Sequence, residues 1–146
     1  MKEEERFRTF TFLINSISRD IRRIKSDEMS KLNLKSPHVS CLYYLYNEQS
    51  LTAKELCEIC GEDKASISRS LDYLIANGYI QNDNFAKRHY KNPIQLTEMG
   101  RKVGSILSER IDNILSEVAI GMTEEERKIL YKSLSLIHDN LQKLSK

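Results

Sequence analysis

Two short helical patterns separated by a tight turn place the strongest constraint on how this chain folds. Thr52 followed by Glu55 is an N-terminal capping box, and Gly61 supplies the left-handed residue that ends the first helix. Asp63 then caps a second helix, which we expect to run from Lys64 to Asn77. Two helices joined by a turn of about three or four residues form a helix-turn-helix.

The second helix has an apolar face and a polar face. The apolar residues recur at helical spacing and are Ile67, Leu71, Leu74 and Ile75. The polar face begins with Lys64, Ser66, Ser68 and Arg69. Such a face is often only solvated, but the first turns of a helix in the major groove reach base edges and phosphates. We therefore predict that these four residues contact DNA, with the serines at bases, while Arg69 either binds DNA or braces the helix against Asp72.

A basic hairpin is predicted directly after this helix. Residues 79–81 and 94–96 alternate in polarity, and the turn-forming residues Asn82, Asp83, Asn84 and Pro93 lie between them. The tip is basic, without an acidic residue from position 84 to 92, and we predict DNA contacts there from Lys87, Arg88, His89 and Lys91. A hairpin of this kind is the wing of a winged helix, which meets phosphates or the minor groove.

Long amphipathic helices are expected on both sides of this segment. The first spans residues 3 to about 31 with a heptad-spaced seam, and a shorter helix with Ser36 as N-cap runs to about Asn47. After Thr97 a helix runs to about Ile120, and a capping box of Thr123 and Glu126 opens the last one. The outer seams are Phe7, Phe10, Ile14, Ile17, Ile21 and Ile24, and Leu130, Leu134, Ile137, Leu141 and Leu144. They either pack on the chain's own core or form a subunit interface, and their position at both ends favours a homodimer.

Length and composition narrow the remaining choices. The 146 residues, 40% of them hydrophobic, predict one domain, and the net charge of +2 means that a nucleic-acid footprint must be local. We expect a cytoplasmic protein without a membrane segment, because no stretch approaches 18 apolar residues and no signal peptide is visible. The catalytic motifs of common enzyme classes are absent, so we expect neither an enzyme nor a cofactor.

The three cysteines fit more than one interpretation. His38 and Cys41, followed by Cys57 and Cys60, have the spacing of a four-ligand zinc site. Cys57 and Cys60 also fall where a helix-turn-helix needs small or apolar core residues, which favours inert packing. Thiol oxidation is the third interpretation. Zinc content of the purified protein, near one equivalent per chain or near zero, separates the first interpretation from the others.

The central third of the chain resembles the MarR family of bacterial transcription regulators. The resemblance is carried by the run from Asp63 to Ile80, by the basic wing and by Leu96-Thr97-Glu98-x-Gly100. It departs at the wing, where Ala86-Lys87-Arg88 lacks the family's aspartate two residues before an arginine. The resemblance implies a mainly α winged helix-turn-helix with a small β wing.

The same resemblance implies an organisation and a function. Residues 1–146 would form one domain, with dimerisation helices at 1–35 and 101–146 around a winged helix-turn-helix at 36–100. The protein would be a homodimer that binds a pseudo-palindromic operator in double-stranded DNA, typically as a repressor that responds to a small-molecule effector. A crevice near Tyr43, Tyr44 and Tyr46 would suit an aromatic effector, although packing also explains these residues. The alternative function is a winged-helix module that docks a protein instead of DNA.

Overall fold

The computed structural model describes residues 1–82 and 92–145. The chain divides into two compact units, Met1–Ser108 and Glu109–Lys146, which we call the N-terminal and C-terminal units. Within the described residues the fold is that of a mainly α winged helix-turn-helix, as the sequence predicts.

The N-terminal helical run is continuous, as predicted, but it is not uniform. It consists of α1 (Glu3–Arg8), a π-helical turn η1 (Thr9–Leu13), α2 (Ile14–Met29) and a 3₁₀ turn η2 (Ser30–Leu32). The hydroxyls of Thr9 and Thr11 donate to the carbonyl oxygens of Glu5 and Phe7 at 2.8 and 2.7 Å. Such back-bonding competes with the regular helical ladder and accompanies its local widening. Asn33 ends the run with a left-handed φ of 56°.

The predicted N-cap of helix α3 (Ser36–Asn47) is wrong by one residue. Ser36, predicted as the N-cap, is the first helical residue, and Lys35 is the N-cap. The His38 ring explains the difference, because its Nδ1 accepts the backbone N–H of Lys35 at 3.1 Å. An imidazole nitrogen thus satisfies a backbone donor at this helix end, where a serine hydroxyl was expected.

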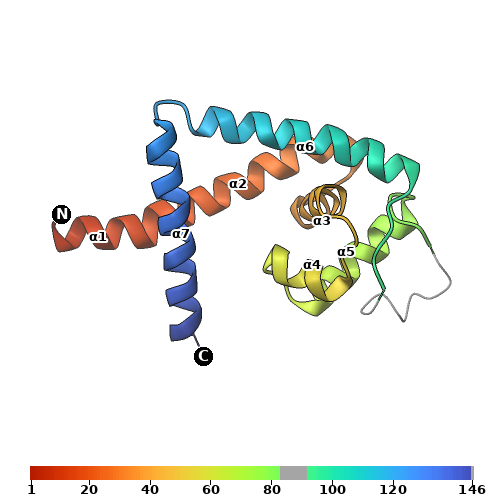
Figure 1. Cartoon of the computed structure of the whole chain (residues 1–146), viewed down its shortest axis with the longest axis horizontal. Helices are drawn as coiled ribbons and strands as arrows, with labels where there is room; N and C mark the ends of the chain where they lie inside the picture. The colour runs from red at the N-terminus through yellow and green to blue at the C-terminus, as the bar shows by residue number, and fades with distance from the viewer. Residues whose placement is uncertain (83–91, 146) are drawn as a thin grey trace. The chain divides into compact units, whose positions relative to one another are not determined.

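Helices α4 (Ala53–Cys60) and α5 (Lys64–Ala76) form the helix-turn-helix. The Thr52 hydroxyl accepts the N–H of Glu55 at 3.2 Å, and Gly61 has the left-handed φ of 64° that the turn requires. The Glu55 carboxylate accepts from the Thr52 hydroxyl and not from the Thr52 backbone, so the predicted capping box is half formed. Both helices pack on α3 and on each other, as Figure 1 shows.

The base of the wing is an antiparallel pairing of short extended segments. Ile80 and Leu96 form a β-bridge, and the Gln81 N–H donates to the Gln95 carbonyl at 2.9 Å. The Ile94 N–H donates to the Leu51 carbonyl at 2.8 Å, so Leu51 extends the pairing.

Helix α6 (Glu98–Val118) begins in the N-terminal unit and continues into the C-terminal unit. Two glycines let the first turns of α6 lie close to Tyr79 and Tyr46. A methyl group on Gly100 would overlap the carbonyl oxygen of Tyr79, and one on Gly104 would lie 2.8 Å from the Tyr46 Cβ. Backbone contact at these points needs a residue without a side chain.

The core of the N-terminal unit comes from α3, α4, α5, the wing base and α6. Its most deeply buried side chains are Val39, Cys41, Leu42, Leu56, Ile67, Leu74, Ile80 and Leu107.

The C-terminal unit consists of the end of α6, a turn and helix α7. The end of α6 is followed by a turn in which Gly121 has a φ of 90°, and α7 runs from Glu124 to Leu144. The predicted capping box is complete, because the Thr123 hydroxyl accepts the Glu126 N–H at 3.1 Å and the Glu126 carboxylate accepts the Thr123 N–H at 2.7 Å. None of the α7 side chains that the structure describes is fully buried within the chain.

Candidate nucleic-acid interface

Helix α5 is anchored by its cap and by one apolar face. The Asp63 carboxylate accepts the N–H of Ser66 at 2.6 Å, which satisfies a free donor in the first turn. Ile67 and Leu74 are no more than 1% exposed, and Leu71 is buried beside them. Burial of these side chains fixes the rotation of the helix about its axis, and with it the direction of the opposite face.

The opposite face presents most of the predicted contact residues to solvent. Lys64, Ser68 and Arg69 are exposed, and Ser66 is half-buried at the cap. Within the described part of the chain no ion pair joins Arg69 to Asp72, so the bracing role considered for Arg69 finds no support. The face therefore offers cationic and hydroxyl groups that can donate to phosphates and base edges.

A clamp that the sequence did not reveal joins α5 to α3. The Tyr73 hydroxyl donates to the carbonyl oxygen of Asn33 at 2.6 Å, and its ring stacks on His38 with centroids 4.1 Å apart and planes 3° from parallel. Burial, reinforced by the nearby Lys35 charge, lowers the pKa of His38. The neutral ring is thus favoured, and it can keep accepting the Lys35 N–H.

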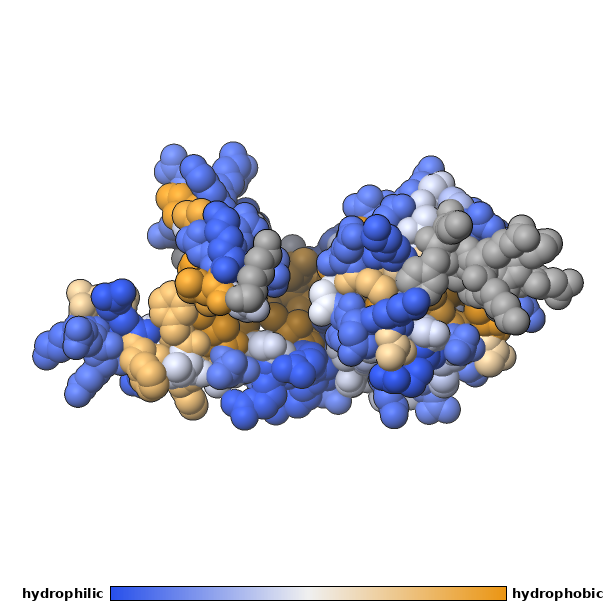
Figure 2. Space-filling model, turned by 90° about the horizontal axis from the view of Figure 1, so that it is seen from below, coloured by the Kyte–Doolittle hydropathy of each residue, from blue (hydrophilic) through white to orange (hydrophobic). Residues whose placement is uncertain are grey.

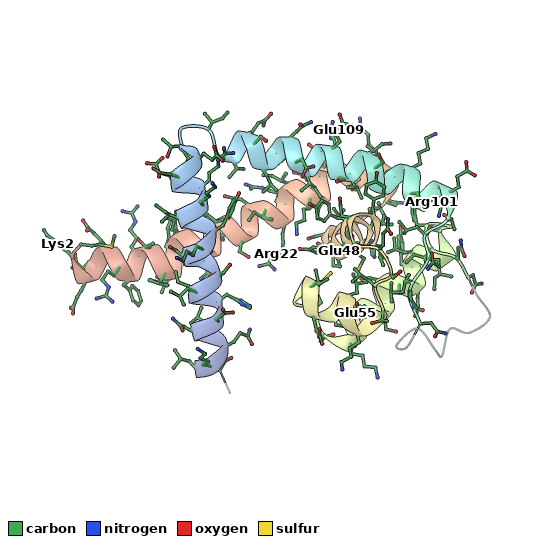
Figure 3. All side chains as sticks on the ribbon, in the orientation of Figure 1. Lys2, Arg22, Glu48, Glu55, Arg101 and Glu109 are labelled. Carbon is green, nitrogen blue, oxygen red and sulfur yellow. The ribbon has the colours of Figure 1, made fainter. Side chains whose placement is uncertain are left out.

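The base of the wing is tied to both α5 and α6. The Thr97 hydroxyl donates to the Gly78 carbonyl at 2.6 Å and accepts the Gly100 N–H at 3.0 Å. The Arg101 guanidinium, labelled in Figure 3, donates to the Leu96 carbonyl at 2.9 Å. These bonds hold the two ends of the hairpin against the helix-turn-helix. The predicted contact residues Lys87, Arg88, His89 and Lys91 lie outside the described residues.

The cysteines do not follow the predicted packing in full. Cys41 is completely buried, but Cys57 and Cys60, in the last turn of α4, are half-buried and are not core residues. Interaction between the two thiols raises the pKa of Cys41 and lowers the pKa of Cys60. His38 is instead engaged by Tyr73 and Lys35, and no metal-binding group of three or more His, Cys, Asp or Glu side chains occurs within residues 1–82 and 92–145. The four-ligand zinc site is therefore not assembled.

None of the helices in the described ranges is long and apolar enough to cross a membrane.

Comparison with known proteins agrees with this geometry. Residues 32–88 match the family model described as the MarR family. Two uncharacterized helix-turn-helix transcriptional regulators are similar in sequence. YfiV of Bacillus subtilis is 24% identical over 82% of this chain and 74% of its own length. A Bacillus cereus protein is 28% identical over 83% of this chain and 81% of its own length.

Two solved structures bound to DNA are also similar. The Staphylococcus aureus MepR–DNA complex has a TM-score of 0.79 at 20% identity, covering 96% of this chain and 99% of that one. A MarR-family regulator from Listeria monocytogenes complexed with a 26mer DNA has a TM-score of 0.75 at 26% identity, covering 88% of this chain and 85% of that one.

Proposed function

We propose that the chain is a regulator of the MarR family, which residues 32–88 match and whose members are transcription regulators and not enzymes, and that it binds operator DNA as a homodimer and represses transcription until a small molecule releases it. The observation that carries the proposal is the exposed polar face of α5, held outward by the buried side chains of Ile67, Leu71 and Leu74.

DNA as the partner is supported by the chemistry of that face and by the similar structures. Lys64, Ser68 and Arg69 offer cations and hydroxyls in the first turns of the second helix, where a helix-turn-helix protein reaches bases. The similar Staphylococcus aureus and Listeria monocytogenes structures are complexes with DNA. With a net charge of only +2, attraction to DNA would be concentrated at this face and at the basic segment that follows it.

A homodimer is supported by apolar side chains that each unit leaves uncovered. On the N-terminal helices Phe7 is 72% exposed, and on α7 Leu134 is 45% exposed. Further exposed apolar residues are Phe10, Phe12, Leu13, Ile17, Ile21, Leu130, Tyr131, Leu136 and Leu141. Figure 2 shows such orange apolar surface open to solvent. A monomer rarely exposes so many large apolar side chains, whereas a second copy of the chain would bury them.

A small-molecule effector is supported by a cavity of about 440 Å³ in the N-terminal unit. Ile14, Ile17 and Ile21 of α2 give it an apolar wall, and Arg22 and Lys25 add two cations. Figure 3 shows Arg22 projecting from α2. A volume of this size with convergent polar groups suits a small apolar anion. None of the tyrosines first considered for an effector crevice lines this cavity, and Tyr46 instead packs beneath Gly104.

The proposal is tested by binding to DNA from the promoter region of the protein's own gene. Fluorescence-labelled fragments of that region should shift in a gel at nanomolar concentrations of the dimer. That concentration should lie roughly a thousandfold or more below the one needed to shift random duplex of equal length. Equal affinity for promoter and random fragments would contradict a sequence-specific regulator. Loss of the shift on adding apolar carboxylic acids would support the effector, and the same acids with an Arg22→Gln variant provide the control.

A further inference from the structure

Tyr73 lies on the flank of α5, between the buried face of the helix and the face that we expect to meet DNA. Its neighbour Leu74 is fully buried, whereas Tyr73 itself is half-buried. Arg69 precedes Tyr73 by four residues, so both side chains leave the same side of the helix one turn apart. A contact that fixes the direction of Tyr73 therefore also fixes the direction of Arg69.

The Tyr73 hydroxyl donates to an acceptor that is itself held in place. Asn33 provides the carbonyl oxygen at 2.6 Å, and it ends the N-terminal helical run with a left-handed φ of 56°. The Asn33 N–H donates to the Ser30 carbonyl at 3.0 Å. The Leu34 N–H donates to the Met29 carbonyl at 3.2 Å, which completes the pattern of a Schellman motif. Met29 and Leu34 are 4% and 2% exposed, so the core holds this junction on both sides.

The aromatic ring of Tyr73 is held as well. It stacks on the His38 imidazole of α3 with centroids 4.1 Å apart and planes 3° from parallel. His38 is in turn fixed, because its Nδ1 accepts the Lys35 N–H at 3.1 Å. A tyrosine side chain turns about only two torsions, so contacts at its ring and at its hydroxyl fix its direction.

The apolar face of α5 decides which side of the helix is buried, but a directional contact defines the rotation more finely. Apolar burial is non-directional, so a small rotation about the helix axis costs little. A hydrogen bond weakens steeply once its angle departs from the optimum. The bond between Tyr73 and Asn33 therefore resists rotations that the apolar face tolerates.

We propose that Tyr73 is a positioning residue for the recognition of DNA sequence: its hydroxyl and ring fix the rotation of α5, so that Ser68 and Arg69 reach the base edges and phosphates of the operator. This role rests on the DNA-binding function proposed above.

A positioning role and a direct contact with DNA have different consequences. Contacts with base edges need donor and acceptor atoms in a fixed register, whereas phosphate contacts through long side chains tolerate small shifts. Loss of the Tyr73 hydroxyl should therefore weaken binding to the operator and leave binding to random duplex unchanged. A tyrosine that donated to a phosphate would instead support binding to both.

The test compares Tyr73→Phe with the parent protein on promoter DNA of its own gene and on random duplex of equal length. The substitution removes the hydroxyl and keeps the ring on His38, so affinity for promoter DNA should fall roughly two- to tenfold, as loss of one hydrogen bond gives. Affinity for random duplex and the salt slope should stay as in the parent. Unchanged promoter affinity, or equal losses on both duplexes, would overturn the proposal.

Two matched variants serve as controls. Asn33→Gly keeps the carbonyl acceptor, and glycine adopts the left-handed φ without strain, so this variant should bind promoter DNA like the parent. Tyr43→Phe removes a hydroxyl from a half-buried tyrosine of α3, whose ring packs edge-on against Tyr44 with centroids 5.4 Å apart, and it should also bind like the parent. A loss in either control equal to that in Tyr73→Phe would contradict the role of the Tyr73 hydroxyl.

Hydrogen exchange of the free protein tests the same role without DNA. In Tyr73→Phe the amides in the second half of α5 should exchange severalfold faster than in the parent, while those of α4 keep their rates. Unchanged exchange in α5, or equal acceleration in both helices, would show that Tyr73 does not position α5. A parent protein that binds promoter and random DNA equally would contradict the proposed function, and the exchange rates would still decide whether Tyr73 holds the helix.

Discussion

At the scale of single residues, His38 makes the fold sensitive to acid. Its folded-state pKa lies below the ordinary value of 6.5, so the unfolded chain binds more protons as pH falls through that region. The contribution of His38 to stability is therefore complete above pH 6.5 and is lost as the pH falls toward the folded-state pKa. Protonation would also remove the acceptor for the Lys35 N–H.

This prediction is checked by urea unfolding at pH 7.5 and 5.5 at one protomer concentration. The parent protein should lose more stability on acidification than His38→Gln, which cannot take up the proton. The exposed His138 provides the control, because His138→Gln should retain the acid sensitivity of the parent. Equal acid sensitivity in His38→Gln and the parent would contradict the role of His38.

Gly100 gives a second prediction at this scale. A methyl group there would overlap the Tyr79 carbonyl oxygen, and backbone cannot move aside as a flexible side chain can. Gly100→Ala should therefore cost about 2 kcal/mol or more of unfolding free energy. Gly121→Ala is the control, because nothing lies within 4 Å of its added methyl and only a left-handed φ opposes it. A loss at Gly100 no larger than that at Gly121 would show that α6 can shift away.

At the scale of elements, we expect α5 to make one contact with a phosphate and another with a base. Arg69→Ala should remove one phosphate contact per subunit, flatten the log-log salt slope of the dimer by about 2, and weaken operator and random duplex alike. Ser68→Ala should leave the slope nearly unchanged and cost about 1 to 3 kcal/mol on the operator alone. Affinities across a salt series measure both. An unchanged slope in Arg69→Ala, or equal losses on both duplexes in Ser68→Ala, would refute this division.

The helix boundaries could be predicted because their signals are local. Asp63, Gly61 and the pair Thr123 and Glu126 act within one helical turn, and the structure places each of them at the predicted end. The apolar spacing of α5 likewise identified its buried face. These features depend on residues a few positions apart, so the sequence alone reports them.

The features that the sequence did not reveal depend on contacts between distant residues. Tyr73 and Asn33 are 40 positions apart, and no periodic pattern in the sequence predicts their hydrogen bond. The His38 ring displaced the expected Ser36 cap for a similar reason, because its stacking partner Tyr73 comes from another helix. The spacing of Cys60 fits a core position, but the residue is half-buried because it lines a cavity beside α2 and α3. How those helices pack cannot be read from the spacing.

At the scale of the whole molecule, the exposed apolar side chains of the outer helices predict a dimer. Charged substitutions at these side chains should dissociate it. Phe10→Glu combined with Leu134→Glu should convert a dimer at micromolar concentration into a monomer in light scattering, because each change would bury an unpaired carboxylate. Ser135→Glu adds the same charge one position along α7 and should leave the dimer intact. A monomeric parent protein would contradict the homodimer.

If two copies of α5 read a two-fold operator, footprinting on the promoter region of the protein's own gene should show a paired site. The dimer should protect one site containing two related half-sites with centres about 10 base pairs, or a multiple of that, apart on one face of the duplex. Ser68→Ala should lose protection at both half-sites together. Protection that spreads evenly along the fragment, or that appears only at concentrations that also cover random duplex, would show that the dimer does not read a two-fold operator.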